Sequence, residues 1–505
     1  MSSIPVAAAA PDDDINALAK GGRTNILGFL LRLAARLPFL FIAGRSYGPD
    51  LVGRFALAVV VVEFAAQLAT LGLKRGLAQA LSSAEDRPHA HVVWDAMTVA
   101  GVASAIASVI LFVFPEILFP SGGVGPLERY LPLVVFTTAW TEISLAALAY
   151  RRNLRAAVTA RAVLEPWTIS IAAFVFSFVT KHEGLVLSYM LSMMVALAAS
   201  LVPFVRSYGL PVGWRPHPGR LWDLARYNVP LAGADAIEWA TRNVDRAILG
   251  YLFEPRVVGI YYMAVQVASL PGKLKTSFDP ILGPVITHSL AIGDKAAVAH
   301  QVRQVGFWII TAQAGLALVG SIPGKAVMGV VGPQFVAGTA AMAFLLFAEV
   351  AASTGAVCES ALVYVSRHVN LMISIGALAF QIALSFGLIL LMRALDWPPN
   401  WQAAGPAVAL LVAMGASSIV KSELLARLLG APTRGWRWQL LAAAAAAVAV
   451  GTIFTSLPHR FEWAQLIIGV PVIAATYLFV LWKTAFDDED KALLRRTPAP
   501  KVAAA

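Results

Sequence analysis

The sequence has little charge and almost no cysteine. Lys, Arg, Asp and Glu make up 13% of its 505 residues, whereas soluble domains carry roughly 25%. The one cysteine, Cys358, excludes an intramolecular disulfide and a cysteine metal cluster. The segment before residue 24 contains Asp12, Asp13 and Asp14 and has no apolar core. We therefore expect no signal peptide and a short cytoplasmic tail. The composition fits neither an ordinary soluble protein nor a disulfide-rich secreted one.

Long apolar runs are what the sequence has in place of charge. Hydrophobic residues make up 58% of the chain, and its mean hydropathy is +0.72. Runs of roughly 18 to 25 such residues are long enough to cross a bilayer as helices. We expect an all-α polytopic membrane protein with about 14 spans, at residues 24–45, 51–73, 92–114, 130–150, 162–180, 185–205, 226–252, 257–283, 304–323, 335–364, 369–392, 403–428, 437–457 and 462–482. The short connections exclude an ATPase module, a separate catalytic domain and a receptor ectodomain.

The net charge of +10 is spread over these short connections. Such a distribution is a topology signal and does not indicate a nucleic-acid partner. If the N-terminus is cytoplasmic, the connections on that side collect far more Lys and Arg than the opposite ones. We therefore expect an even number of spans and both termini in the cytoplasm.

The chain also repeats itself. Residues 49–59 align with residues 255–265 at a constant offset of 206, with Pro, Val, Gly, Ala and Val identical. Parallel halves related by an axis along the membrane normal are a transporter architecture, and chance similarity between two Pro-Gly turns is the alternative. We expect Gly53 and Gly259 to lie at equivalent places, where a helix begins close to a neighbouring backbone.

The repeat predicts a division of the chain into six parts. These are a cytoplasmic tail at 1–23, an N-lobe of six spans at 24–206, a cytoplasmic linker at 207–222, a C-lobe of six spans at 223–430, an extra helix hairpin at 431–484 and a disordered cytoplasmic tail at 485–505.

Motifs of soluble enzymes are missing. Residues 320–326 resemble a phosphate-binding loop, but the segment is one residue short and ends in Ala where Ser or Thr would bind magnesium. His89 and His91 have no third metal ligand nearby in the sequence, so we interpret them as surface residues. We predict no catalytic residues, no cofactor and no metal site.

Ionisable residues inside the predicted spans are informative, because each is costly unless it is paired or faces water. The first span holds two arginines one turn apart, the second holds an acid, and span 226–252 carries five charges along one helix face. The candidate substrate-binding cations are Arg32, Arg36, Arg242 and Arg246. The candidate acids, for cavity charge or ion coupling, are Glu63, Asp235, Glu238 and Asp245.

Each of these charges also has a purely structural interpretation. Arg32 can extend its head to the cytoplasmic interface, whereas Arg36 lies about 18 Å from the start of its span, at 1.5 Å per residue. In span 226–252, Glu238 with Arg242 and Arg242 with Asp245 are spaced to neutralise each other along the helix.

The first hairpin, at residues 44–58, and Leu71-Gly72-Leu73 after it resemble the opening of polysaccharide-transporter flippases of the multidrug/oligosaccharidyl-lipid/polysaccharide (MOP) exporter superfamily. Residues 228–230, 242–246, 258–261 and 278–284 extend the resemblance, which covers roughly residues 24–430. It implies two six-helix lobes around a central cavity, with cavity cations in the first helix, where Arg32 and Arg36 lie. The C-terminal hairpin is similar to that of fourteen-span flippases.

The function that this resemblance implies is the transfer of a lipid-linked oligosaccharide across a bacterial inner membrane, for exopolysaccharide, capsule or lipopolysaccharide O-antigen synthesis. The implied partners are that substrate, membrane lipids and other polysaccharide-assembly proteins. One alternative is a drug/cation antiporter of the same superfamily, which would use carboxylates such as Asp235 and Glu238. A second is an integral-membrane glycosyltransferase or polymerase, which needs acid/base residues on substantial outer loops.

The repeat also gives a specific hypothesis about the site. The offset of 206 maps Arg36 onto Arg242, so a two-fold axis would place both guanidinium groups on inward faces, where they could bind an anionic diphosphate. The alternative is an ion pair between the lobes, from Arg36 to Asp235 or Glu238.

Overall fold

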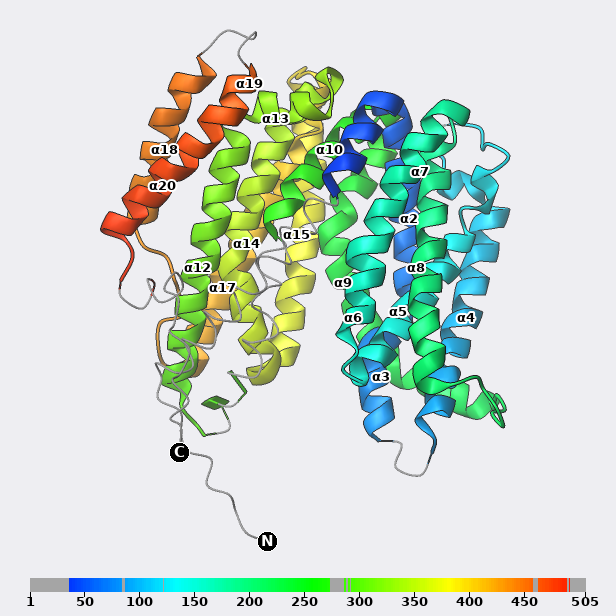
Figure 1. The fold of residues 1–505 in the computed structure, drawn as a ribbon. Coiled ribbons are helices and arrows are strands. Elements are labelled where there is room, and N and C mark those ends of the chain that lie inside the picture. Colours follow the sequence, from blue (N-terminus) through cyan, green and yellow to red (C-terminus); the bar gives the residue numbers. More distant parts are fainter. Residues whose placement is uncertain are drawn as a thin grey trace, which may run out of the picture.

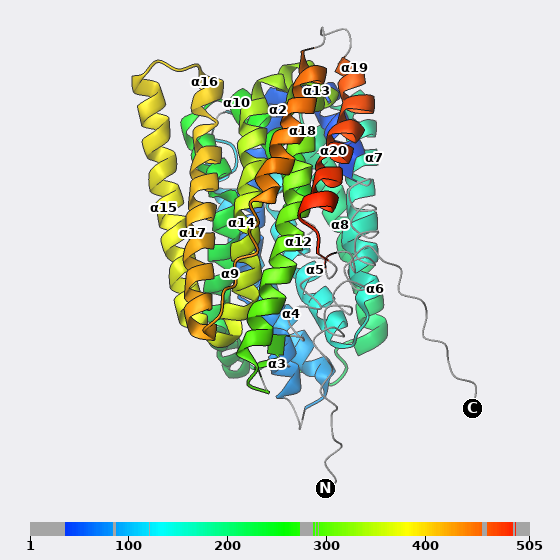
Figure 2. The ribbon, with the colours of Figure 1, turned by 90° about the vertical axis from the view of Figure 1, so that its left-hand side faces the viewer.

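The structure, a computed structural model, describes residues 36–83, 87–120, 122–272, 286–287, 289–290, 292–456, 462–487 and 490. Regular structure within these residues is helical, as predicted. Figure 1 shows two helix bundles side by side. A helix pair lies at the edge of one of them (Figures 1 and 2). We call the bundles the N-lobe (η1 to α8) and the C-lobe (α9 to α17).

Long apolar helices build the N-lobe, and short helical turns connect or extend them. In chain order they are η1 (Ala43–Tyr47), α2 (Gly48–Ala69), α3 (Leu73–Ser82), α4 (His89–Val113), η2 (Pro115–Ile117), η3 (Glu128–Tyr130), α5 (Leu133–Tyr150), α6 (Leu154–Ala157), η4 (Val158–Leu164), α7 (Glu165–Val179) and α8 (Gly184–Tyr208). The chain turns between η1 and α2 at Gly48, whose φ of 80° is a left-handed conformation that favours glycine (Figure 1).

The C-lobe follows a linker at residues 209–217. Its helices are α9 (Pro218–Leu252), α10 (Pro255–Gly272), α12 (Lys295–Ser321), α13 (Gly324–Val331), η6 (Pro333–Gly338), α14 (Thr339–Val365), α15 (Arg367–Ala394), α16 (Pro399–Gln402) and α17 (Gly405–Leu429). The additional pair consists of α18 (Gln439–Thr455) and the continuous run of α19 (Glu462–Ala464), η8 (Gln465–Gly469) and α20 (Val470–Thr484), and the two pack against each other.

Ten helical segments among the described residues are long and apolar enough to span a membrane. The described part of the predicted span 24–45, residues 36–45, and the predicted span 51–73 fall in one continuous segment, Arg36–Ser82. Residues 24–35 of the first span lie outside the described residues. The predicted span 226–252 lies in α9, where charges lower the hydropathy, and 257–283 runs beyond the described part of α10. Span 437–457 corresponds to α18, which has 17 residues. The number fourteen therefore stays a prediction.

Three hydrophobic cores show how the lobes are joined. One core contains residues of both lobes, including Phe55 of α2 and Tyr261 of α10. At the opposite end each lobe has its own core, one around Phe204 in the N-lobe and one around Phe307 in the C-lobe. We call these ends the hairpin end, after the turns at Gly48 and Glu254, and the linker end. In the described part of the chain the lobes share a core at the hairpin end and diverge toward the linker end (Figure 1).

The joint at the hairpin end has two-fold character. A β-carbon on Gly53 would overlap the carbonyl oxygen of Pro255, and one on Gly259 would overlap that of Pro49. Asp50 and Arg256, also equivalent under the offset of 206, face each other with 3.8 Å between carboxylate and guanidinium. The predicted close approach of backbone at both glycines is confirmed, and the neighbour in each case is the equivalent segment of the other lobe.

Replacing Gly53 with Leu should push α2 and α10 apart, because the atom that its β-carbon meets belongs to the backbone and cannot turn away. A cysteine pair at positions 50 and 256, in a Cys358→Ser background, reports the separation through the yield of cross-linking by a short bis-maleimide. We expect the yield to fall several-fold. Gly387→Leu is the matched control, because a β-carbon there has nothing within 4 Å, and an equal yield in both variants would contradict the prediction.

Candidate substrate site between the lobes

Charged side chains gather where the N-lobe faces α9. Arg36, at the first described position, is exposed, as is Arg242 on α9, while Arg246 is half-buried. Neither Arg36 nor Arg242 forms an ion pair with any residue that the structure describes. The predicted cation Arg32 lies outside the described residues.

Arg75 of α3 holds the two acids of α9 that lie nearest the linker end. Its Nε is 2.9 Å from Asp235 Oδ1, and its Nη2 is 2.6 Å from Glu238 Oε2. Asp235 is buried, with its side chain 3% exposed, whereas the side chains of Arg75 and Glu238 are about half exposed. An ion pair from Arg36 to either acid is therefore not formed in this structure.

The backbones of α3 and α9 come close beside these ion pairs. A β-carbon on Gly72 would crowd the backbone of Asn228 and Ala232, and Gln79 Nε2 donates to Tyr227 Oη at 2.8 Å. The first half of α9 thus packs on the N-lobe, although α9 is the first helix of the C-lobe in chain order.

The charged side chains in the second half of α9 have partners that differ from those predicted along the helix. Asp245 accepts a hydrogen bond from the Tyr261 hydroxyl of α10 at 2.6 Å. Arg246 donates to the Asn243 side chain. Ion pairs between Glu238 and Arg242, or between Arg242 and Asp245, are absent from the described residues, so that part of the interpretation was wrong. Because α9 packs against α3 and α10, Glu238 binds Arg75 and Asp245 binds Tyr261 instead.

A second network crosses the N-lobe beside Glu63. Arg161 of η4 lies 2.5 Å from Glu142 and 2.7 Å from Glu165, and Lys74 lies 2.9 Å from the other oxygen of Glu142. The charges that act on the Glu63 carboxylate are those of Arg246, Glu165, Arg36 and Arg161. The structure thus brings three predicted site residues, Arg36, Glu63 and Arg246, into one electrostatic neighbourhood.

Sequence reasoning missed Lys74, Arg75 and Arg161, which lie in the predicted connections just outside the spans 51–73 and 162–180. Helix continuity is the signal that could have found them. Residues 36–82 form one apolar segment, so Arg75 follows the predicted span without a break. Arg161 is four residues before Glu165, which is the spacing of an ion pair along a helix.

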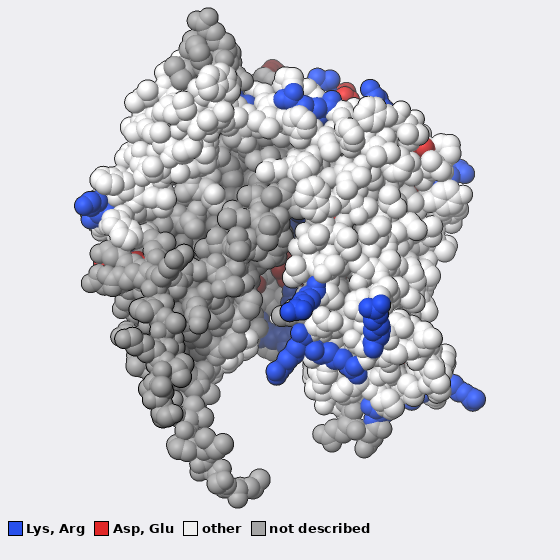
Figure 3. Space-filling view, viewed as in Figure 1, with Lys and Arg blue, Asp and Glu red and all other residues white. Residues whose placement is uncertain are grey.

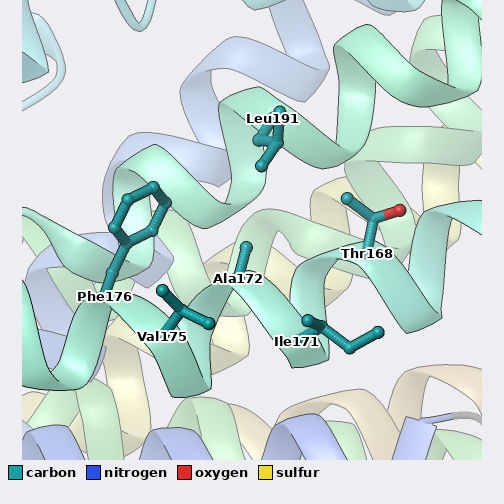
Figure 4. Close-up of a pocket in the computed structure, with 6 residues that line it drawn as sticks. All are labelled: Thr168, Ile171, Ala172, Val175, Phe176 and Leu191. Carbon is teal, nitrogen blue, oxygen red and sulfur yellow. The ribbon is translucent and has the colours of Figure 1, made fainter.

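The described residues contain no group of three or more His, Cys, Asp or Glu side chains able to hold a metal ion. An apolar groove of about 270 Å³ lies between α7 and α8, lined by Thr168, Ile171, Ala172, Val175, Phe176 and Leu191 (Figure 4). It offers contact to hydrocarbon and no group for acid/base chemistry.

Replacing Arg75 with Ala should destabilise the protein by about 1–3 kcal/mol, because the buried carboxylate of Asp235 loses its partner. Glu238→Ala should cost less, since that pair is half exposed and screened by solvent. Thermal unfolding of the purified protein in detergent measures both. Adding Asp235→Asn to Arg75→Ala should restore most of the stability, and a double variant no more stable than Arg75→Ala would show that Arg75 acts through packing.

Comparison with known proteins places this arrangement in a family. Residues 18–287, which is 270 of the 505 residues, match the model of a family described as polysaccharide biosynthesis protein. No curated protein sequence matches the chain. The lipid II flippase MurJ, in an inward closed conformation, is similar in structure, with a TM-score of 0.64 and 11% identity over 90% of this chain and 98% of that one.

Two conformations of multidrug resistance MATE transporters of the MOP superfamily are also similar. The inward-facing one has a TM-score of 0.61 and 13% identity over 80% of this chain and 98% of that one. The outward-facing one has a TM-score of 0.53 and 14% identity over 84% and 96%. At such identities the likeness shows the fold. With the match over more than half of its length, the chain belongs to the polysaccharide biosynthesis protein family and has the membrane-transporter fold of the MOP superfamily.

Proposed function

We propose that this protein is a flippase that moves a lipid-linked oligosaccharide across the bacterial inner membrane. The observation that carries the proposal is the pair Arg36 and Arg242, which are both exposed, lie in the predicted spans 24–45 and 226–252, and are equivalent under the 206-residue offset. An unpaired cation in hydrocarbon costs at least about 2.5–3.5 kcal/mol. Such residues are retained where water or an anion replaces the hydrocarbon. Membership of the polysaccharide biosynthesis family supports a glycan carrier as the source of that anion.

The diphosphate of a lipid-linked sugar suits this pair of arginines. Each guanidinium offers two parallel N–H donors to a phosphate, and these charge-assisted hydrogen bonds are stronger in a water-poor site. Arg246 extends the cationic surface toward Glu63. Because Asp235 and Glu238 bind Arg75, they leave Arg36 and Arg242 available to the substrate.

Transport would proceed by rocking of the two lobes. The lobes share a core at the hairpin end and have separate cores at the linker end, which is the arrangement of a carrier open toward the linker end. In this proposal the linker end and both termini are cytoplasmic, and the protein works beside other polysaccharide-assembly proteins.

The alternatives receive less support. A drug/cation antiporter needs carboxylates free to bind a cation, whereas Asp235 and Glu238 are neutralised by Arg75. A glycosyltransferase or polymerase needs acid/base groups on an outer loop. In the loop between α4 and α5, Glu128 is buried and bound to Arg54 at 2.6 Å, which is a structural role. We therefore propose no enzymatic activity.

Replacing Arg36 or Arg242 with Ala should reduce export of the glycan at least tenfold if each contributes one charge-assisted contact of about 1.5–3 kcal/mol. Arg36→Lys should retain part of the activity, because it keeps the charge and loses the bidentate geometry. The measurement is restoration of surface polysaccharide in cells that lack the gene, with membrane insertion verified for each variant. Arg367→Ala, an exposed arginine at the linker end of α15, is the control. Full export by both Ala variants would contradict the proposed site.

The orientation has its own test. In a Cys358→Ser background, a cysteine at Gly123 or Pro399, both exposed, should react with an impermeant maleimide added to intact cells. A cysteine at His217 or Gly430, exposed at the linker end, should react only after the membrane is opened. Labelling of position 217 in intact cells would reverse the proposed topology.

A further inference from the structure

Basic side chains gather at the linker end of the N-lobe, outside the proposed substrate site. They come from the turn after α5, the end of α8, the linker and the start of α9, and all are exposed: Arg151, Arg152, Arg206, Arg215 and Arg220. Figure 3 shows Lys and Arg gathered over the lower part of this lobe, below a belt almost free of charge. No acid forms an ion pair with these five within the described ranges. We call this surface the basic platform.

The linker that carries part of the platform is firmly anchored. Asp95 of α4, which is buried, accepts a hydrogen bond from Trp214 Nε1 at 2.9 Å and one from Arg87 Nη2 at 2.8 Å. Trp94 Nε1 donates to the Gly209 carbonyl at 3.3 Å. With the linker fixed at both of these points, Arg215 is held at the surface next to Trp214.

Two of the other arginines, Arg151 and Arg220, are oriented by their neighbours. The guanidinium carbon of Arg151 lies 4.1 Å from the ring centre of Tyr208, and Arg151 also donates to the Ser207 carbonyl. Arg220 Nη2 lies 3.5 Å from the Arg215 carbonyl oxygen. These contacts use backbone oxygens and a ring face, so the positive charge of each guanidinium remains uncompensated.

Exposed apolar and aromatic side chains border the platform. Val212 in the linker is 84% exposed and Trp222 at the start of α9 is 67% exposed, and Leu210 and Tyr227 are exposed beside them. Trp and Tyr beside arginines are typical of a membrane interface, where the ring lies at headgroup level and the charge meets phosphate. Asp223 is the one acid between residues 209 and 227, so the segment keeps a positive charge.

Several basic residues after the middle of α17, at the same end of the molecule, form ion pairs. Arg427 and Arg434 both bind Glu423, at 3.3 and 3.2 Å, and Arg437 binds Asp490 at 2.7 Å. Positive charge there is partly neutralised within the protein. The five arginines of the platform, in contrast, have no such ion pair within the described ranges.

We propose that the basic platform binds the headgroups of anionic phospholipids in the leaflet at the linker end. The guanidinium groups would take the phosphate oxygens, while Val212, Trp222 and their neighbours lie among the upper acyl carbons. Binding would hold the linker and the start of α9 at the membrane surface. This role does not depend on which glycan is moved.

The test is thermal unfolding of the full-length protein in detergent, titrated with dioctanoyl phosphatidylglycerol. We expect the unfolding temperature of the wild type to rise with lipid concentration, because a ligand that binds the folded state stabilises it. The variant Arg152→Gln/Arg215→Gln/Arg220→Gln should lose more than half of that rise. The matched control, Lys295→Gln/Arg303→Gln/Arg367→Gln, removes the same charge from exposed positions of the C-lobe at the same end and should keep the rise.

Two further titrations distinguish headgroup binding from the binding of acyl chains or of free anions. Dioctanoyl phosphatidylcholine should give little rise, and an equal rise would show acyl-chain binding without headgroup recognition. Inorganic phosphate should also give little, and an equal rise would assign the platform to free anions. If the Gln variant folds poorly, Lys at the same three positions retains the charge and should retain the rise. A full response in the Gln variant, or none in the wild type, overturns the proposal.

Discussion

The cost of a charge at membrane depth, at least about 2.5–3.5 kcal/mol, shapes the interior of this protein. In the N-lobe, Arg161 shares its guanidinium between Glu142 and Glu165, and on its border Arg75 binds two acids of α9. Arg36 and Arg242, which form no ion pair with a described residue, are exposed. In the proposed function, water or an anionic ligand surrounds these two guanidinium groups, as a transport path requires.

Closure at the hairpin end relies on backbone contact between α2 and α10. Gly53 and Gly259 allow each helix to touch the proline carbonyl of the other, and the charged contact beside them, Asp50 with Arg256, is exposed and long at 3.8 Å. Exposed ion pairs contribute little to stability. In the proposed transport cycle, separation of this joint would expose part of the core shared by the lobes and would leave no buried ion pair broken at the contact of Asp50 with Arg256.

The spans, the repeat and the charged positions were predicted from the sequence more accurately than the ion-pair partners of the charged side chains. Hydropathy and the 206-residue offset depend on local residue types, and both Gly53 and Gly259 were placed correctly. The partner of Glu238 is Arg75, 163 residues away in the chain, and helix spacing instead suggested Arg242. A local pattern gives the neighbours along one helix, whereas the packing of α3 against α9 is a property of the whole fold. For the same reason Arg75 and Arg161 were assigned to connections.

The helix α9 carries Arg242 between two sets of contacts, one to each lobe. On one side of it, Asp235 and Glu238 bind Arg75 of the N-lobe. On the other side, Asp245 binds Tyr261 of α10 in the C-lobe. The cores at the linker end are separate, whereas α9 is held by both lobes. If the lobes rock as proposed, a change in the angle between them acts on the stretch of α9 that carries Arg242. The exposure of this guanidinium would then be coupled to the conformation of the protein.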